Sequence, residues 1–375
     1  YRGISLLSTT YKIYAKILSN RLSNIAETLI SEEQTGFRKG RSCTDNVFTV
    51  RQIIEKRREF NLETHILFID YKKAFDKLSR PKLWNILMKI GIPSHLKDVI
   101  KELYEETKIQ IKQREPVKIS GGVRQGCPLS TTLFNLYLND MIQTWKQQIT
   151  GGINLGTLTV KTLAFADDQI LLAKNEDELQ RMLYKLNIVA KTYNMEISPE
   201  KTKVMAFKGS HPVRSKIILE NKTIEQVSKF NYLGCDISFV NEIDVNNKIN
   251  KFSYITGTLK RTLRNKARKD SIMKLYKTMA VPTITYGSET WTMTAKHTAR
   301  IQTAEMNFLR PIAGYQRIDR KQNKDIRQQL NIEELNTTIA KYRTNWKQHL
   351  IRMTDDRIPK AALNYKPRGR RGLGR

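Results

Sequence analysis

The chain has 375 residues and a formal net charge of +30, from 66 Lys and Arg against 36 Asp and Glu. A chain of this length can bury a sizeable core and divide into two or three lobes. So large a positive excess predicts a polyanionic partner, nucleic acid ahead of a membrane surface. The sequence has no signal peptide and no apolar run close to the ~20 residues of a membrane span, so we expect an intracellular protein with no membrane partner.

Two further compositional features narrow the class of protein. Residues 241–375 hold 29 Lys and Arg against 11 Asp and Glu, a net of +18, and end in KPRGRRGLGR, which predicts an unfolded cationic tail. Cys43, Cys127 and Cys235 form no C-x-x-C pair, so neither a zinc knuckle nor a disulfide framework is indicated. Both ends of the chain are abrupt, and we expect a piece of something longer.

The predicted elements, in chain order, mix helices and strands. Apolar spacing and turn residues predict a helix over 8–30, a buried strand over 65–70, helices over 81–91 and 94–107, a hairpin over 157–173, a helix over 176–193 and a strand over 201–207. Beyond residue 240 the pattern is mostly helical, at 245–280, 294–313 and 332–352. This order predicts an α+β fold with an all-helical C-terminal part.

Two adjacent aspartates, Asp167 and Asp168, interrupt the apolar stretch LAFADDQILL. Desolvated neighbouring carboxylates are costly unless they are paired or bind a cation, although Asp also suits a simple hairpin turn. Asp70 ends a buried strand, so three carboxylates converge if the two strands are neighbours. Such oxygen ligands suit Mg2+ with substrate phosphates, and two such ions clamp an in-line phosphoryl transfer.

Five stretches occur in an order that resembles reverse transcriptase motifs A to E. They are FIDYKKAFDKL (68–78), GGVRQGCPLSTTLFNLYLND (121–140), FADD (165–168), SPEKTKVM (198–205) and FNYLG (230–234). Two earlier stretches, YRGISLLSTTYKIYAKILSNRL and EEQTGFRKGRSCTDNV, look like finger motifs, with Gly3 where the family usually has Pro. FADD together with GFRKGRS is similar to the polymerases of non-LTR (LINE-type) retrotransposons. WKQHLIRMTDDRIPKAAL resembles the segment that follows the polymerase in many insect-type elements.

This resemblance implies an α+β right-hand polymerase with fingers, an antiparallel-sheet palm that carries helices on one face, and a helical thumb. We expect fingers at 1–60, palm with the remaining finger segments at 61–240, thumb at 241–330 and a basic extension at 331–375. The implied reaction is RNA-directed DNA synthesis by two-metal transfer from a dNTP to a primer 3'-hydroxyl. The implied partners are an RNA template, a DNA primer and dNTPs, with two Mg2+ ions as cofactor and Mn2+ as a substitute.

The resemblance also implies roles for individual residues. The metal ligands are Asp70 and Asp167, with Asp168 as the neighbouring acid, and Lys201 is a candidate general acid for the pyrophosphate leaving group. Phe75 stands where the family excludes a ribose 2'-hydroxyl. The expected nucleotide-binding residues are Arg38, Arg41, Phe75, Gln125 and Gly126, and the expected primer and template contacts are Lys12, Tyr232, Leu233 and Gly234. Three further residues have other expectations: Asp76 a secondary acid of the site, Cys127 a packing residue, and Lys39 either a template contact or a solvated side chain.

Two rival interpretations stay open at this point. The first is the same fold without polymerase activity, as a nucleic-acid-binding remnant of a degraded element. The second is a maturase-type reverse transcriptase of a group II intron, which would differ in its C-terminal part. No spaced acids beyond residue 240 suggest an RNase H, and no cysteine follows Cys235 for a zinc knuckle. We therefore expect an endonuclease to come from another part of the element. We also expect a nuclear location.

Overall fold

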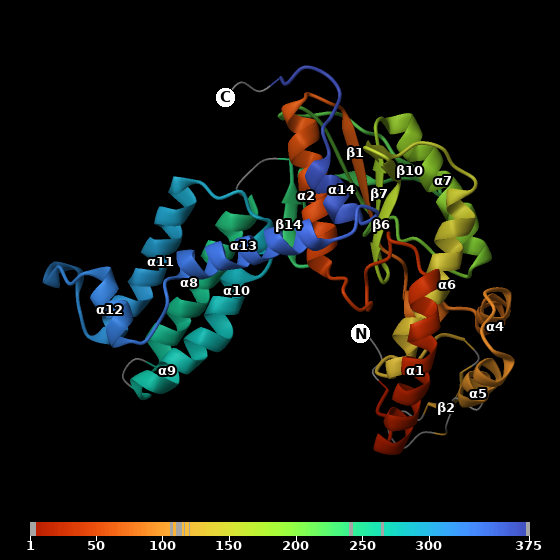
Figure 1. Ribbon diagram of the computed structural model, residues 1–375, viewed down its shortest axis with the longest axis horizontal. Coiled ribbons are helices and arrows are strands. Elements are labelled where there is room, and N and C mark those ends of the chain that lie inside the picture. The colour runs from red at the N-terminus through yellow and green to blue at the C-terminus, as the bar shows by residue number, and fades with distance from the viewer. Residues whose placement is uncertain are drawn as a thin grey trace. The chain divides into compact units, whose positions relative to one another are not determined.

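The computed structural model describes residues 5–105, 108–109, 115, 117–119, 121–239, 243–263 and 266–372 (Figure 1). Gly3, the departure from the family pattern, lies outside the described residues. The chain divides into two compact units. Unit 1 comprises Tyr1–Leu233 and Asp356–Arg375, and unit 2 comprises Gly234–Asp355. Each unit contains a hydrophobic core of its own.

A six-stranded sheet forms the centre of unit 1. Its order is β12–β8–β1–β7–β6, and β9 pairs with β8. These strands are β1 (Thr64–Ile69), β6 (Thr162–Phe165), β7 (Asp168–Ala173), β8 (Lys203–Lys208), β9 (His211–Pro212) and β12 (Glu225–Gln226). The central strand β1 is antiparallel to both neighbours, with Phe68 opposite Ile170 of β7 and Lys203 of β8. The short edge strand β12 runs parallel to β8. The predicted antiparallel sheet is therefore confirmed, apart from this one edge pairing.

Helices and short strands surround this sheet. They are α1 (Thr9–Leu29), α2 (Cys43–Glu59), α3 (Ala74–Lys77), α4 (Arg80–Lys89), α5 (Ser94–Glu105), β2 (Lys108–Ile109), β3 (Val117–Lys118), α6 (Pro128–Lys146), β4 (Ile153–Leu155), β5 (Leu158–Val160), α7 (Glu176–Thr192), β10 (Ile218–Leu219), β11 (Lys222–Thr223), β13 (Lys229–Tyr232) and α14 (Ile358–Asn364). The helices expected over 8–30, 81–91 and 176–193 are confirmed, and the helix expected over 94–107 is confirmed as far as Glu105. The long strand expected before the two aspartates is broken at Lys161, because β5 pairs with β4 rather than joining the central sheet.

Both faces of the central sheet are covered, since every residue of β1 is buried. Leu67 and Ile69 belong to the core that also contains residues of α6 and α7. Phe68 points the other way, because successive side chains of a strand alternate between faces. Its ring lies 6.1 Å from that of Tyr232, whose hydroxyl accepts a hydrogen bond from Asn46 of α2. Figure 1 accordingly displays α2 and α7 on opposite sides of the strands. The expectation of helices on one face only is wrong, because side chains of β1 are buried on both faces of the sheet, Leu67 and Ile69 on one and Phe68 on the other.

The chain segment that begins at Asp356 belongs to unit 1, where α14 packs against α2. Arg357 is buried and pairs with Asp45 of α2 at 2.7 Å and with Glu32. The cationic tail expected to be unfolded has neither helix nor strand in its described part. It nevertheless contacts α2, since Gly372 donates a backbone hydrogen bond to the Glu59 carbonyl at 2.8 Å.

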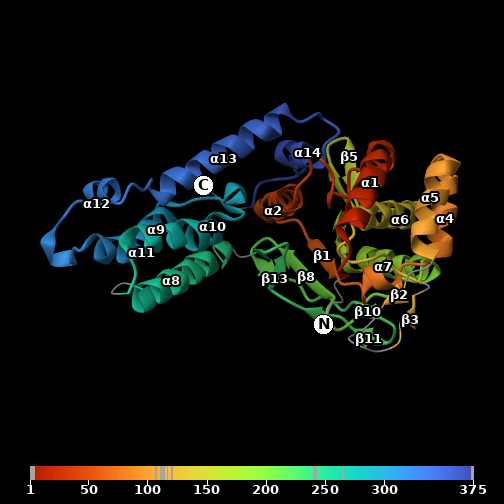
Figure 2. The same ribbon diagram turned by 90° about the horizontal axis from the view of Figure 1, so that it is seen from below.

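The described part of unit 2 is helical apart from β14 (Cys235–Ser238). Its helices are α8 (Ile243–Leu263), α9 (Lys269–Leu275), a π-helical turn (Tyr276–Ala280), α10 (Val281–Thr285), a 3-10 turn (Ser288–Thr290), α11 (Ala295–Ala313), a second 3-10 turn (Arg317–Asp319), α12 (Asn323–Gln329) and α13 (Leu335–Arg352) (Figure 2). The helices expected over 294–313 and 332–352 are confirmed, whereas the one expected over 245–280 is divided. In the part of the chain that the structure describes, no helix combines the length and apolar character of a membrane span.

Candidate active site

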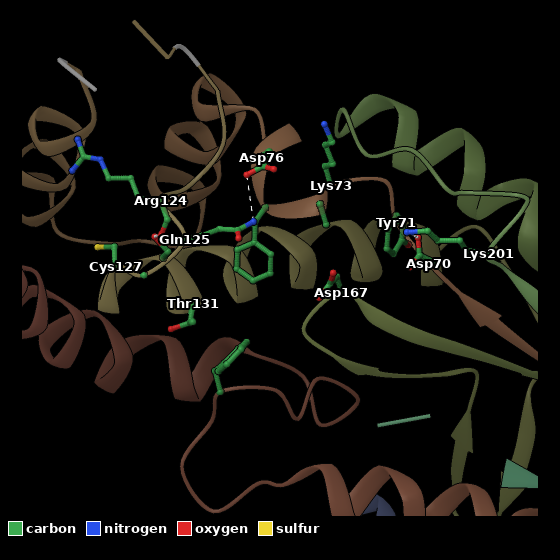
Figure 3. Close-up of a pocket in the computed structure, with 15 residues that line it drawn as sticks. Asp70, Tyr71, Lys73, Asp76, Arg124, Gln125, Cys127, Thr131, Asp167 and Lys201 are labelled. Carbon is green, nitrogen blue, oxygen red and sulfur yellow. Dashed lines mark hydrogen bonds and ion pairs between the residues drawn. The ribbon is translucent and has the colours of Figure 1, made fainter. Parts of the chain in front are cut away.

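Two of the predicted acids lie at the end of neighbouring strands. Asp70 directly follows β1, and Ala166 and Asp167 form the turn between β6 and β7, because Phe165 pairs with Asp168. The register of β1 against β7 places Ile69 opposite Gln169, which brings Asp70 to the same edge as the turn. Asp70 and Asp167 line one cavity of about 500 Å3 (Figure 3).

Asp168 does not line this cavity. It is exposed as the first residue of β7, and successive residues of a strand point to opposite faces. Burial raises the pKa of the Tyr232 hydroxyl, and the negative charge of Asp168 raises it further. The structure therefore brings two of the three predicted carboxylates into the cavity. Asp76 also lines it, and Gln125 donates a hydrogen bond to its carboxylate at 3.4 Å.

The Asp70 carboxylate is incompletely satisfied. Its Oδ2 atom is buried and accepts no hydrogen bond from the residues that the structure describes. The Lys201 ammonium is 3.6 Å from this oxygen, and Figure 3 displays the lysine over Asp70 at one end of the cavity. The loop that carries Lys201 also holds the Asp70 backbone, since Ser198 donates to its carbonyl at 2.8 Å and its N–H donates to Thr202 at 3.4 Å.

An unsatisfied buried carboxylate oxygen is a position that a cation would occupy. Among the described residues, however, no three His, Cys, Asp or Glu side chains lie close enough to hold a metal ion by themselves. The carboxylates that line the cavity are those of Asp70, Asp76 and Asp167. This arrangement fits an ion such as Mg2+, which commonly takes one or two carboxylates and fills its other positions with water and substrate phosphates.

The opposite end of the cavity is formed by the loop before α6. Gln125 and Gly126 line it, and Gly126 has a φ of 104°, which favours glycine. Gly122 approaches α3 so closely that a Cβ atom there would lie 2.6 Å from the Asp76 carbonyl oxygen. The Arg124 guanidinium lies 5.0 Å from the ring of Tyr11 and 5.1 Å from that of Tyr104. These contacts fasten the loop against α1, α3 and α5.

Phe75 lines the cavity and also packs in the core. Its ring is stacked on that of Phe134 in α6, with a centroid distance of 4.1 Å and an interplanar angle of 11°. Its carbonyl accepts a hydrogen bond from Val123 at 2.9 Å. The ring is therefore held rigidly at the cavity wall, as the proposed exclusion of a 2'-hydroxyl requires.

The two predicted triphosphate-binding arginines are not in the lining of this cavity. The Arg38 side chain is only 4% exposed, and its guanidinium donates to Glu27 and to the backbone carbonyls of Ser31 and Gln34. Arg41 pairs with Glu32 at 2.7 Å. Arg38 and the exposed Lys39 line a separate cavity of about 380 Å3. Binding of a nucleotide by Arg38 and Arg41 stays a prediction.

The predicted primer and template residues are divided between the two units. In unit 1, Lys12 is on the exposed side of α1, Tyr232 is buried, and Leu233 has a φ of 49°. In unit 2, Gly234 has a φ of 77°, and a Cβ atom there would lie 3.0 Å from the Tyr286 ring. Their contacts with nucleic acid stay a prediction.

Sequence reasoning missed seven residues of the cavity wall, namely Phe37, Tyr71, Lys73, Ala74, Arg124, Ser130 and Thr131. Lys73 is exposed and has a φ of 49°, a conformation that a non-glycine residue rarely adopts. It lies within the FIDYKKAFDKL motif, directly before α3. Its neighbour Lys72 pairs with Glu196 instead and does not line the cavity. Burial raises the pKa of Tyr71, whose hydroxyl donates to Gln169 at 2.6 Å.

Comparison with known proteins decides what this cavity belongs to. Residues 1–237 match the family model described as reverse transcriptase (RNA-dependent DNA polymerase). The chain belongs to the reverse transcriptase family. The predicted family, the α+β right-hand polymerase fold and the enzyme class of a nucleotidyltransferase are thereby confirmed. Members of this family generally use a divalent metal ion.

Curated relatives come from retrotransposons and related elements. The Transposon TX1 uncharacterized 149 kDa protein of Xenopus laevis is 32% identical over 48% of this chain and 14% of its own length. The Pol polyprotein of type-2 retrotransposable element R2DM from Drosophila melanogaster is 25% identical over 66% of this chain and 24% of its own. The probable RNA-directed DNA polymerase from transposon X-element of the same fly is 23% identical over 98% and 42%. The non-LTR affiliation is confirmed, and the chain spans less than half the length of these relatives.

Solved structures include distant neighbours. Apo telomerase from Candida tropicalis has a TM-score of 0.47 and 14% identity, covering 95% of this chain and 61% of that chain. A likeness at this level decides nothing by itself. The fold assignment rests on the family match and on the described elements of unit 1.

Proposed function

We propose that this reverse transcriptase domain copies an RNA template into DNA, transferring a nucleotidyl group from a dNTP to the 3'-hydroxyl of a DNA primer. The observation that carries the proposal is the cavity at the end of β1 and the β6–β7 turn. Asp70 and Asp167 line it together, and one Asp70 oxygen has no hydrogen-bond donor among the described residues. We keep the nuclear location and an endonuclease from another part of the element as predictions.

Asp70 and Asp167 are the proposed ligands of two Mg2+ ions, for which Mn2+ is a substitute, and Asp168 is the neighbouring acid. Such ions, when bound, activate the primer hydroxyl and neutralise charge on the transferred phosphate. The protein's own contribution is geometric. The Asp70 backbone is held by two hydrogen bonds with the 198–202 loop: its carbonyl accepts from the Ser198 N–H, and its N–H donates to the Thr202 hydroxyl. Asp167 is fixed by the turn between two sheet strands.

Lys201 is the proposed donor of a proton to the pyrophosphate leaving group. Its side chain is 72% exposed, and its ammonium is 3.6 Å from Asp70 Oδ2 at the rim of the cavity. A long exposed side chain on a loop can move toward a bound triphosphate and gives up only this one 3.6 Å contact. Mobility of this kind suits a general acid that acts on a departing group.

The proposed nucleotide-binding surface comprises Phe75, Gln125 and Gly126, which all line the cavity. Phe75 is held by stacking on Phe134, so it would lie rigidly beneath the sugar. Arg38 and Arg41 are proposed for the triphosphate. This role requires that each guanidinium leave its partner, Glu27 or Glu32 respectively.

Unit 2 is the proposed thumb, and α8 offers it a nucleic-acid-binding face. Lys251, Tyr254, Thr258 and Arg261 are all exposed and recur at the spacing of one helical face. Tyr254 is 73% exposed, although an aromatic side chain is usually at least partly buried. Cationic side chains beside an exposed aromatic suit a phosphate backbone and its sugars. Lys12, Tyr232, Leu233 and Gly234 stay the proposed primer and template contacts.

The test is extension of oligo(dT) on poly(rA) with dTTP and Mg2+, using the whole chain. We expect extension by the wild type, and none by Asp167→Asn, while both bind the primer–template equally. Asp177→Asn, which neutralises an exposed aspartate in the first turn of α7, is the matched control and should extend normally. A folded wild-type chain that binds the duplex but does not extend it would favour the inactive remnant.

A further inference from the structure

The turn that carries Asp167 has an unfavourable backbone. Ala166, directly before this aspartate, has a φ of 54°. The left-handed region is common for glycine but rare for an alanine, which has no polar side chain to stabilise it. Such a conformation persists only where the surroundings hold it in place. The direction of the Asp167 side chain therefore depends on whatever fixes the peptide groups on either side of Ala166.

The side chain of Gln34 bonds both of these peptide groups. Its Oε1 atom accepts from the Ala166 N–H at 3.0 Å, and its Nε2 atom donates to the Ala166 carbonyl at 3.3 Å. The same Oε1 atom also accepts from Gly36 at 3.0 Å. Gln34 is fully buried, so water does not compete for these hydrogen bonds. One amide thus fixes the planes before and after the strained residue.

The segment that carries Gln34 is itself anchored on β6. The Ala164 N–H donates to the Glu33 carbonyl at 2.8 Å, and the Thr35 N–H donates to the Ala164 carbonyl at 2.9 Å. Gly36 approaches the turn so closely that a Cβ atom there would lie 2.4 Å from the Ala166 nitrogen. Residues 33–36 are therefore held independently of the Gln34 side chain.

We propose that Gln34 is a positioning residue, which sets the orientation of Asp167 by fixing the Ala166 peptide groups. The inference rests on the proposed function, because it assumes that Asp167 is a metal ligand. Gln34 touches neither substrate nor metal in this role. Residues that orient a metal ligand commonly change metal affinity or activity by ~10–100-fold when they are replaced.

The test compares Gln34→Met with Gln180→Met in the whole chain. Met retains the length of Gln and removes both hydrogen-bonding atoms. Gln180, near the start of α7, is the matched control because its amide makes the same kind of bond pair to one backbone, donating to the Ile218 carbonyl at 2.9 Å and accepting from the Ile218 N–H at 2.8 Å. The measurements are kcat and KM for dTTP, primer–template affinity, the melting temperature, and the dissociation constant for Mn2+ alone by electron paramagnetic resonance.

For Gln34→Met we expect kcat to fall and the Mn2+ dissociation constant to rise, each by ~10-fold or more, with primer–template affinity unchanged. Gln180→Met should alter neither quantity. Wild-type kcat and Mn2+ affinity in Gln34→Met would overturn the proposal. If Asp167→Asn also proved active, the metal assignment rather than the role of Gln34 would have failed.

A second variant separates positioning from stability. Glycine adopts a φ of 54° without strain, so adding Ala166→Gly to Gln34→Met should recover melting temperature lost through the turn. It does not restore the fixed peptide planes, so kcat and Mn2+ affinity should stay low. Recovery of both quantities together with the melting temperature would reduce Gln34 to a structural residue. Loss of folding in both the single and the double variant would also overturn the proposal.

Discussion

Asp70 in unit 1 and Glu305 in unit 2 are carboxylates in opposite situations. Asp70 Oδ2 is buried without a hydrogen-bond donor among the described residues, and its neighbouring cation is 3.6 Å away. Glu305 is fully buried and saturated: its Oε2 accepts from Arg327 at 3.1 and 2.6 Å, and its Oε1 from the Leu335 N–H at 3.1 Å. The deeper acid is thus the better satisfied one.

This difference separates a structural acid from a functional one. Burial raises the pKa of Glu305, and the Arg327 guanidinium acts in the opposite direction. Every bond that Glu305 makes joins α11 to α12 or α13, so its charge serves the packing of unit 2. Asp70 leaves part of its bonding capacity for something outside the chain. An unsatisfied carboxylate in a cavity is costly to the fold, and such costs are typical of sites that act on a ligand.

The difference between Asp70 and Glu305 predicts opposite effects when each carboxylate is replaced by its amide, and the effect on activity is the largest that we expect. Asp70→Asn should lower the rate of primer extension by about a thousandfold or more, about 4 kcal/mol, because a metal ligand is lost. Its melting temperature should not fall, since no hydrogen bond to Oδ2 is removed. Glu305→Gln should do the reverse, lowering the melting temperature but leaving the rate per folded molecule unchanged at low temperature. Equal effects of the two variants on both quantities would contradict the distinction.

Arg327→Met tests whether Glu305 depends on the cation that pairs with it. It leaves Glu305 buried without its cation, and breaking a buried pair in this way costs about 3–5 kcal/mol in the free energy of unfolding. The control is Arg371→Met, which removes a pair with Glu59 whose arginine side chain is 60% exposed and should cost less than about 1 kcal/mol. Chemical denaturation measures both. A loss of stability no greater than that of the control would mean that Glu305 does not need its partner.

The sequence predicted the acids of the site because they are tied to strand ends. Asp70 follows an apolar run and Asp167 lies inside a hairpin pattern, so their meeting required only that β1 and β7 pair. Asp168 was grouped with them, although the alternation of a strand directs it away from the cavity. The order of the motifs was enough to predict the family, and the local apolar spacing was enough to predict the helices α1, α4 and α7.

Other parts depended on contacts that no local pattern contains. The pairing of Arg38 with Glu27 of α1, and of Arg41 with Glu32 just after α1, is set by how residues 30–41 fold beside the end of that helix. Gln34 lies in a quoted motif, yet an uncharged residue gives no sign that it clamps a turn 132 positions later. The helices α2 and α6 were missed because both are buried on several sides, which removes the amphipathic period.

A third prediction uses two stacked aromatic pairs, one in each unit. Phe75 stacks on Phe134 at 4.1 Å beside the cavity, and Tyr276 stacks on Phe308 at 5.1 Å in the core of unit 2. Phe75→Val should admit ribonucleotides, because a rigid ring rejects an added hydroxyl by steric clash, and a clash is more selective than hydrogen bonding here. The ratio of kcat/KM for dATP over ATP should fall by ~10–100-fold.

The matched variant is Phe308→Val, which should lower the melting temperature and leave this ratio unchanged. Phe75→Val should lower dATP incorporation only modestly, through lost packing against Phe134. An unchanged ratio in a folded, active Phe75→Val enzyme would make Phe75 a core residue like Phe308.

The smallest expected effect concerns two kinds of surface cation in unit 2, those on the proposed nucleic-acid-binding face and those paired with acids. Lys251 and Arg261 lie on the proposed nucleic-acid-binding face of α8, whereas Lys321 and Lys341 pair with Asp325 and Glu333. The double variant Lys251→Gln/Arg261→Gln should reduce the slope of log affinity against log salt by about 1.4–1.8, since each phosphate contact contributes ~0.7–0.9. Lys321→Gln/Lys341→Gln removes the same charge from cations already paired with acids, and should change the slope little. Equal slopes for the two double variants, measured by fluorescence anisotropy on an RNA–DNA duplex, would mean that net charge rather than the α8 face governs binding.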